Sequence, residues 1–146
     1  MNHPVILDSG PLGQISHADP SRHAEIKDWF DLLLARGIPV FISAIADFEV
    51  RRSLILAQRT RSLARLDALQ NQAAFLPIAN PELRLAARLW AMARKHGRPG
   101  VDPKELNADV ILAAQAISIA DAVIATDNVG HLGQFVDARP WRSILP

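Results

Sequence analysis

Hydrophobic and polar residues follow two different patterns along this chain. Short apolar runs that stop at a polar or turn residue predict β-strands at residues 5–8, 38–42, 74–78 and 122–125, with a further short strand at 141–145. Longer segments, in which apolar residues recur every three or four positions, predict helices at residues 22–35, 43–58, 62–72, 80–96 and 102–119. In the first of these helices, Ile26, Trp29, Phe30 and Leu33 share one face.

Residues that favour helix ends support these boundaries. Ser43 is expected to cap the helix after the second strand, and Asn80, followed by a proline, to cap the helix that begins there. Asp102 and Glu105 have the spacing of a capping box. The glycines and proline of residues 97–101 predict a loop between these last two helices.

The alternation of strands and helices predicts an α/β fold, a three-layer α/β/α sandwich with a mostly parallel central sheet of four or five strands. A length of 146 residues suits one domain, so residues 1–146 are expected to fold as a unit. Hydrophobic residues make up 49% of the chain, which is enough for a sizeable core.

Composition narrows the function classes. The chain has no cysteine, which excludes disulfides and thiolate metal sites. No stretch approaches the roughly 20 apolar residues of a membrane-spanning helix, so we expect a soluble, cytoplasmic protein. The net charge is only +1, so any nucleic-acid binding must come from local clusters of basic residues.

Four acidic residues stand out by their positions. Asp8 and Asp127 each follow an apolar strand, and Glu49 lies in the second turn of the helix after the second strand. Asp109 begins a stretch without charge that continues to Asp121, as expected of a buried helix. Ligands of parallel sheets bind outside the carboxyl ends of the strands, so these four acids are expected to converge at one edge.

Carboxylates that converge repel one another, and a hard cation removes the conflict. Mg²⁺ or Mn²⁺ prefers oxygen ligands together with water and substrate phosphate. Such a metal activates water and stabilises a leaving oxygen, so hydrolysis of a phosphodiester is the natural chemistry. No pair of histidines has the spacing of a helical zinc site.

Each acid also has a simpler interpretation, which the sequence leaves open. Asp8 begins a turn, Glu49 pairs on the surface with Arg51 or Arg52, Asp109 is an exposed acid favoured by the helix dipole, and Asp127 with Asn128 forms a plain turn. Asp47 is a second cleft candidate, although Arg51, four residues later, indicates a surface ion pair.

The basic residues form clusters rather than a uniform field. Arginine binds phosphate in a bidentate fashion, and Arg51 and Arg52, one turn from Glu49, are the first candidates for binding RNA. A second group is Arg59, Arg61 and Arg65, for which solvated helix faces are the simpler interpretation.

Four segments follow one another along the chain in this order: VILDSGPLG, ISAIADFEVRRSL, LNADVILAAQA and VIATDNVGHLGQFV. Together they resemble the PIN-domain nucleases, and most closely the VapC-like toxins of bacterial toxin–antitoxin pairs. The resemblance implies a Mg²⁺- or Mn²⁺-dependent ribonuclease that forms a homodimer and is blocked by a cognate antitoxin protein.

The resemblance also implies a role for single residues. Asp8, Glu49 and Asp109 match the family's metal-binding acids, and Ser9 matches a small hydroxyl residue that follows the first acid. Thr126 matches a threonine that precedes the fourth position, which either Asp127 or Asn128 then fills. His131 lies where the family often has a histidine and is expected to fix the loop after the strand.

Two other function classes remain open. A non-catalytic PIN-like module would bind RNA or protein without cleaving it. A phosphohydrolase with an aspartyl nucleophile is less well supported, because no second acid lies two residues after Asp8 and no lysine lies in an apolar stretch.

Overall fold

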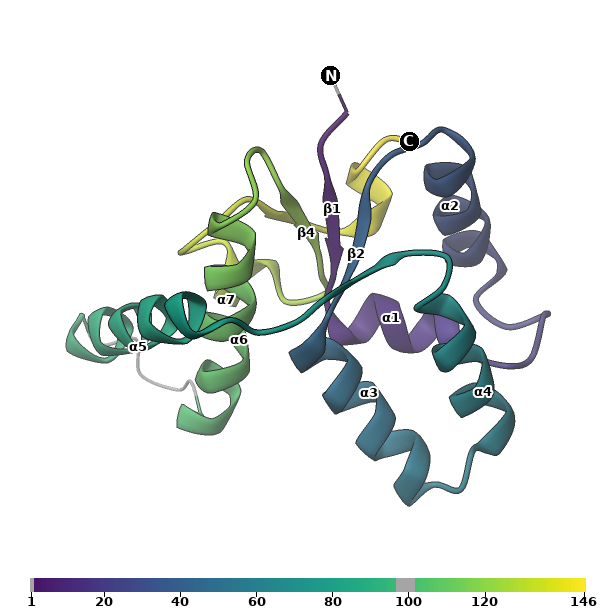
Figure 1. The fold of residues 1–146 in the computed structure, drawn as a ribbon, viewed down its shortest axis with the longest axis horizontal. Helices are drawn as coiled ribbons and strands as arrows, with labels where there is room; N and C mark the ends of the chain where they lie inside the picture. The colour runs from purple at the N-terminus through teal and green to yellow at the C-terminus, as the bar shows by residue number, and fades with distance from the viewer. Residues whose placement is uncertain (1, 97–101) are drawn as a thin grey trace.

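Five short parallel strands form a single sheet in the computed structural model, which describes residues 2–96 and 102–146 (Figure 1). The strands are β1 (Val5–Leu7), β2 (Val40–Ser43), β3 (Ala74–Leu76), β4 (Val123–Ala125) and β5 (Ala138–Arg139). Their order across the sheet is β3-β2-β1-β4-β5, and every neighbouring pair is parallel. The predicted mostly parallel sheet is therefore confirmed.

Strand β1 lies at the centre of the sheet and is buried on both faces. Val5 and Leu7 belong to the larger hydrophobic cluster on one face, and Ile6 belongs to a second cluster on the other. This is the alternation that a strand imposes, since successive side chains point to opposite faces. Both faces must therefore be covered by helices.

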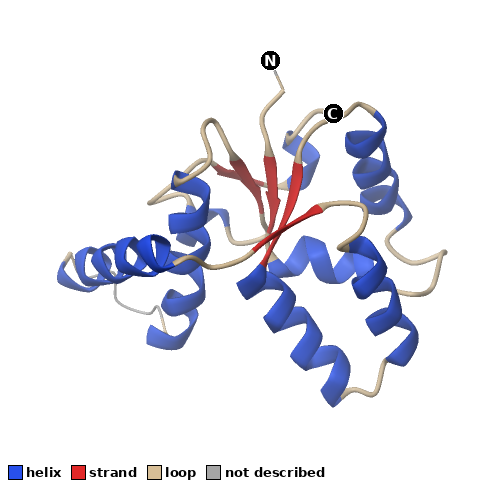
Figure 2. Ribbon diagram, in the orientation of Figure 1, coloured by secondary structure: helices blue, strands red, loops and turns tan. Residues whose placement is uncertain are grey.

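Within residues 2–96 and 102–146, seven helices surround the sheet (Figure 2). They are α1 (Ser9–Ser16), α2 (Ala24–Ala35), α3 (Ala44–Leu56), α4 (Thr60–Leu69), α5 (Asn80–Lys95), α6 (Pro103–Ile117) and α7 (Val129–Leu132). Side chains of α1, α2, α3 and α4 join the cluster of Val5 and Leu7, whereas those of α6 and α7 join the cluster of Ile6. Helix α5 packs on α6 in a third cluster. The three-layer sandwich is confirmed, and within the described residues no helix has the length and hydrophobicity needed to cross a membrane.

Most predicted helices and the first four strands lie where the sequence placed them. Ser43 caps α3 as predicted, its hydroxyl accepting a hydrogen bond from the Ile45 amide at 3.2 Å. Helix α6 begins directly after Asp102, while the predicted loop at 97–101 lies outside the described residues. The predicted cap Asn80 is instead the first residue of α5, and the Glu82 carboxylate accepts the Ala79 amide at 3.0 Å.

The prediction of a strand at 141–145 is wrong. Pro140 cannot donate a ladder hydrogen bond, and Trp141–Ser143 forms a 3₁₀-helix after it. The fifth strand is β5, a two-residue segment too short to show a pattern in the sequence. Helix α1 was also missed, because its sequence SGPLGQIS is poor in helix-forming residues. Burial of Leu12 and Ile15 and a cap from Asp8 stabilise it.

The Gln115 side chain connects α6 with the ends of β2 and β3 at the carboxyl edge of the sheet. Its side chain is fully buried on α6 and accepts a hydrogen bond from the Ser43 hydroxyl at the end of β2, at 2.7 Å. Its amide nitrogen donates to the carbonyls of Leu76 and Pro77, at 3.1 and 3.2 Å, where β3 ends. The side chain thus satisfies backbone groups that have left the sheet ladder.

We expect Gln115→Met to lower the free energy of unfolding by about 2–3 kcal/mol, because a side chain of similar size would leave buried carbonyls without donors. Urea unfolding followed by circular dichroism measures this loss. Gln72→Met is the matched control, since Gln72 is exposed, and it should change stability by less than about 0.5 kcal/mol. Equal effects of the two substitutions would contradict the assigned role of Gln115.

Candidate metal centre at the sheet edge

Asp8 and Thr126 meet because their strands are neighbours in the sheet. Strands β1 and β4 pair in parallel with Leu7 opposite Ala125, so the residues that follow, Asp8 and Thr126, emerge side by side. The Thr126 hydroxyl donates a hydrogen bond of 2.7 Å to Oδ2 of Asp8 and is itself fully buried. It also accepts the Asn128 amide at 2.8 Å, so the threonine links Asp8 to the loop after β4.

The second oxygen of Asp8 is held from the other side. Asp8 caps α1, and its Oδ1 accepts the Ser9 amide at 2.7 Å. The amino end of a helix favours a carboxylate through the exposed N–H groups and the dipole. Both oxygens of Asp8 are therefore oriented before any ligand binds. Ser9 contributes its backbone N–H to this arrangement.

The carboxylate of Asp109 is only partly stabilised by its surroundings. It lies on α6, where its Oδ2 is buried without a hydrogen-bond partner among the described residues. Burial and, after it, the nearby charges of Asp8 and Glu49 raise the pKa of Asp109 to about 6, while His131 opposes the shift. Nδ1 of His131 lies 3.7 Å from Oδ2 of Asp109, so the ring of this histidine faces the acid, and the expectation that it fixes the loop after β4 stays a prediction.

Glu49 approaches the same place from α3. Burial raises the pKa of its carboxyl, and the negative charge of Asp8 adds to the effect, whereas the guanidinium of Arg52 lowers it. The structure thus brings Asp8, Glu49 and Asp109 within electrostatic reach of one another, as the sequence predicted. In residues 2–96 and 102–146, however, no group of three acidic or histidine side chains is positioned to bind one metal ion.

Mg²⁺ or Mn²⁺ fits these residues in two respects. The donors are carboxylate oxygens, which hard cations prefer, and the unpartnered Oδ2 of Asp109 needs a positive charge or a donor. A metal that keeps several water ligands needs no closed cage of side chains.

Asp127 and Asn128 occupy different surroundings, although both are exposed. The carboxylate of Asp127 lies against Gly10 in the first turn of α1, so closely that a Cβ at Gly10 would collide with it. Asp127 is therefore near the helix end that Asp8 caps. Asn128 donates its backbone N–H to Thr126 and directly precedes α7, while its side chain makes no hydrogen bond within the described residues.

The two arginines predicted to bind RNA differ in availability. Arg51 donates to both oxygens of Asp47, at 3.0 and 3.1 Å, and to Asp67 at 2.8 Å, and these bonds raise its pKa. The predicted Asp47–Arg51 pair therefore forms, but Asp47 is buried, so it is not a surface pair. The Arg52 side chain is 60% exposed, 3.8 Å from Glu49, and lies over the Phe48 ring.

Gly10 and the helix that contains it are the part of the site that the sequence did not reveal. The pair Ser9-Gly10 predicts a turn, because a glycine in the first turn of a helix is unusual. The trace of the helix in the sequence is the apolar pair Leu12 and Ile15, three residues apart, which is too short a pattern to predict a helix.

Comparisons with known proteins agree with this arrangement. A sequence model of the PIN domain matches residues 5–131. A search of curated proteins found no match. Solved structures with a similar fold include VapBC2 from Rickettsia felis bound to a promoter DNA fragment, with 15% identity, a TM-score of 0.75, and 94% of this chain and 98% of that chain covered.

Two further structures are similar. FitAcB from Neisseria gonorrhoeae is 22% identical with a TM-score of 0.72, covering 95% of this chain and 99% of that chain. DNA-bound VapBC from Salmonella typhimurium is 20% identical with a TM-score of 0.68, covering 95% and 98%. At these identities the likeness establishes the fold.

The raised pKa of Asp109, whose side chain is partly buried, leads to a pH-dependent effect on stability. With a folded pKa of about 6 against an ordinary value of 3.8, the folded chain holds a proton that the unfolded chain releases, so the free energy of unfolding falls as pH rises through this window. We expect Asp109→Asn to stabilise the metal-free protein by on the order of 2 kcal/mol at about pH 7.5.

At about pH 4.5, where the folded carboxyl is mostly protonated but the unfolded one is already mostly ionised, the same substitution should stabilise the protein only about a third as much. Urea unfolding in EDTA at the two pH values measures the difference. Asp28→Asn, at an exposed position on α2, is the control and should not show this pH dependence. A stabilisation by Asp109→Asn that is equal at both pH values would contradict the assignment.

Proposed function

Because the chain belongs to the PIN-domain family, we propose that it is a Mg²⁺- or Mn²⁺-dependent endoribonuclease and the toxin of a type II toxin–antitoxin pair. The observation that carries this proposal is the convergence of Asp8, Glu49 and Asp109 at the carboxyl edge of the sheet, with one buried carboxylate oxygen of Asp109 unpartnered among the described residues.

In this proposal Asp8, Glu49 and Asp109 would hold the metal, directly or through its waters. The bound metal would lower the pKa of a water molecule and neutralise charge on the scissile phosphate. Thr126 orients Asp8 through the hydrogen bond to Oδ2, and the Ser9 amide orients the other oxygen. Asp127, beside the first turn of α1, is our candidate for the fourth position.

Arg52 is the better candidate for contacting the RNA backbone near this centre. Its side chain is exposed and only loosely paired with Glu49, whereas the guanidinium of Arg51 is taken up by two carboxylates. Contacts of this kind supply affinity that weakens as salt rises.

The proposed partners are a cognate antitoxin and a second copy of the chain. Structures of similar fold include VapBC complexes. Helix α3 exposes Phe48, Ile55 and Leu56, with 55, 59 and 87% of each residue accessible, and exposed apolar residues of this size favour a protein interface. We place the protein in the cytoplasm, where RNA and an antitoxin would be met.

A non-catalytic PIN-like module is the second candidate. It is favoured by the open arrangement of the acids, since no three side chains among the described residues are closed around one point. The two candidates differ in whether RNA is cut when metal is supplied.

Asp8→Asn and Asp109→Asn should each reduce Mn²⁺-dependent RNA cleavage on the order of a thousandfold, because each removes a charged metal ligand. Initial rates on a labelled RNA, with Mn²⁺ varied, measure the loss. Asp28→Asn should retain full activity. Full activity of both site variants would exclude this centre, and intact RNA with the unsubstituted protein would favour the non-catalytic module.

Comparison of Asp127→Ala with Asn128→Ala identifies the fourth position. We expect Asp127→Ala to raise the Mn²⁺ concentration needed for half-maximal cleavage roughly tenfold. Asn128→Ala keeps the backbone N–H that Thr126 accepts, so its Mn²⁺ dependence should stay close to that of the unsubstituted protein. The reverse order of effects would assign the fourth position to the Asn128 amide.

A further inference from the structure

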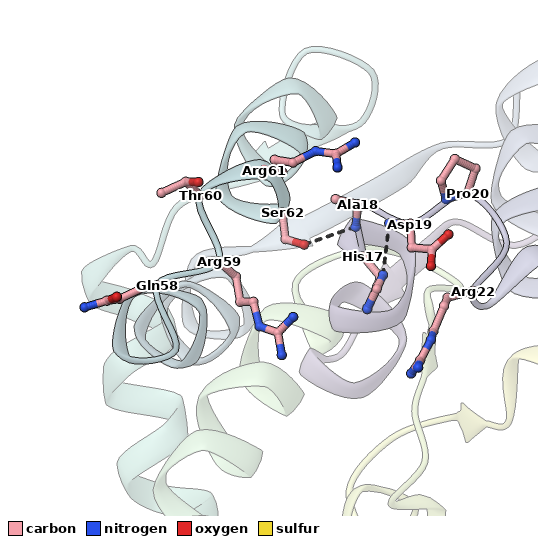
Figure 3. A pocket seen from close by; sticks show the side chains of 10 residues that line it. All are labelled: His17, Ala18, Asp19, Pro20, Arg22, Gln58, Arg59, Thr60, Arg61 and Ser62. Atoms are coloured by element: carbon pink, nitrogen blue, oxygen red, sulfur yellow. Dashed lines mark hydrogen bonds between the residues drawn. The ribbon is translucent and has the colours of Figure 1, made fainter.

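A cavity of about 530 Å³ lies away from the acids, between the loop that follows α1 and the turn that joins α3 to α4 (Figure 3). Its lining includes three arginines, Arg22, Arg59 and Arg61, but only one acid, Asp19. Most of its other lining residues are polar, among them His17, Gln58 and Thr60.

These three arginines lack the partners that other arginines have. Arg51, Arg139 and Arg142 are paired with carboxylates at 3.0 Å or less. In the part of the chain that the structure describes, Arg22, Arg59 and Arg61 form neither an ion pair nor a side-chain hydrogen bond.

The carboxylate of Asp19, the one acid of the lining, is hydrogen-bonded within its own turn. The Asp19 carboxylate accepts the amide and the hydroxyl of Ser21, at 3.0 and 2.8 Å. The surroundings carry further positive charge, since the pKa of His17 is lowered by burial and then by His23, Lys27 and Arg22. The lining thus carries three arginines against the single carboxylate of Asp19, which forms no ion pair with them among the described residues.

The walls of the cavity are held in place. The Ser62 hydroxyl, buried at the start of α4, accepts the Ala18 amide at 3.0 Å, and Arg65 donates to the Ile15 carbonyl at 2.7 Å. In the same turn as Ser62, Gln58 adopts a left-handed conformation, φ 55°, which follows the end of α3 and turns the chain directly into Arg59. These contacts join α1, α3 and α4 around the cavity.

The arginines are spread rather than focused on one point. In Figure 3 the side chains of Arg22 and Arg59 extend in the same direction as the His17 ring, whereas the side chain of Arg61 lies apart from them, above Ser62 in this view. One phosphate group would not reach all three guanidinium groups. A chain of phosphates would, which favours a nucleic-acid strand over a small phosphorylated molecule.

Helices α1 and α3 connect this cavity with the acids. Helix α1 begins at Asp8 and its eight residues span about 12 Å before His17, while α3 carries Glu49 and ends just before Gln58. A short stretch of single strand can span such a distance.

We propose that this cavity, named here the arginine cavity after Arg22, Arg59 and Arg61, binds backbone phosphates of the RNA strand whose scissile bond lies at the acids. The proposal rests on the proposed ribonuclease function. It assigns the cavity to affinity for the strand and leaves the cleavage chemistry to Asp8, Glu49 and Asp109.

The test measures binding and cleavage separately. Binding of a fluorescent single-stranded RNA of about 12 nucleotides is followed by anisotropy in EDTA, over a range of salt concentrations, so that no cleavage occurs. The variants are the double substitution Arg22→Gln/Arg59→Gln and, as a control with the same loss of charge, Arg84→Gln/Arg88→Gln on the exposed surface of α5.

We expect the cavity variant to bind roughly tenfold more weakly and its log–log salt slope to fall by about 1.4, about 0.7 for each lost phosphate contact on a single strand. The control should bind like the unsubstituted protein. Neither substitution removes an ion pair that the described residues form, so thermal unfolding should be unchanged.

Equal losses in the cavity variant and the control would overturn the proposal and leave the ribonuclease function standing. A different result is that inorganic phosphate displaces the RNA and binds as tightly as the RNA does. That result would overturn the proposal in favour of a small phosphorylated ligand. Cavity-dependent binding without any Mn²⁺-dependent cleavage would support the cavity and reject the ribonuclease.

Discussion

The parallel pairing of β1 with β4 is the constraint on which the site depends. The strand order reverses here, since β2 and β3 lie on one side of β1 while β4 and β5 lie on the other. Ligand sites of open α/β sheets form where the order reverses in this way. The pairing brings together residues 118 positions apart in the chain, and the hydrogen bond from Thr126 to Asp8 is its direct product. A shift of register by one residue would separate the two side chains.

The acids around this point differ in how their burial is compensated. Asp8 is held by a hydroxyl and a backbone N–H, so its charge is stabilised by the protein itself. Asp109 has one oxygen without a donor among the described residues and a pKa raised to about 6. An uncompensated carboxylate lowers stability, and such costs concentrate where a ligand supplies the missing charge. The contrast suits a site with one prearranged oxygen ligand and one that depends on a cation.

Much of this organisation could be predicted from the sequence, but not all of it. Apolar runs that end on Asp8 and Thr126 reveal strands and their carboxyl edge, because hydrophobic periodicity is local. Helix α1 could not be predicted in this way, since its stability comes from burial of Leu12 and Ile15 and from the Asp8 cap rather than from its glycine-containing sequence. The pairing of Arg51 with Asp67 joins two helices, and no local pattern encodes such a contact.

Helix α1 also relates the two charged regions of the molecule. Its amino end lies at Asp8 and near Asp127, where the helix dipole favours negative charge. Its carboxyl end lies at His17 in the arginine cavity, where the dipole favours positive charge. Acids and unpaired arginines are thereby kept about a helix length apart, instead of neutralising each other as Asp47 and Arg51 do. A strand of phosphates laid along this helix would meet cations at one end, and at the other a cluster of acids that a metal ion would make attractive to it.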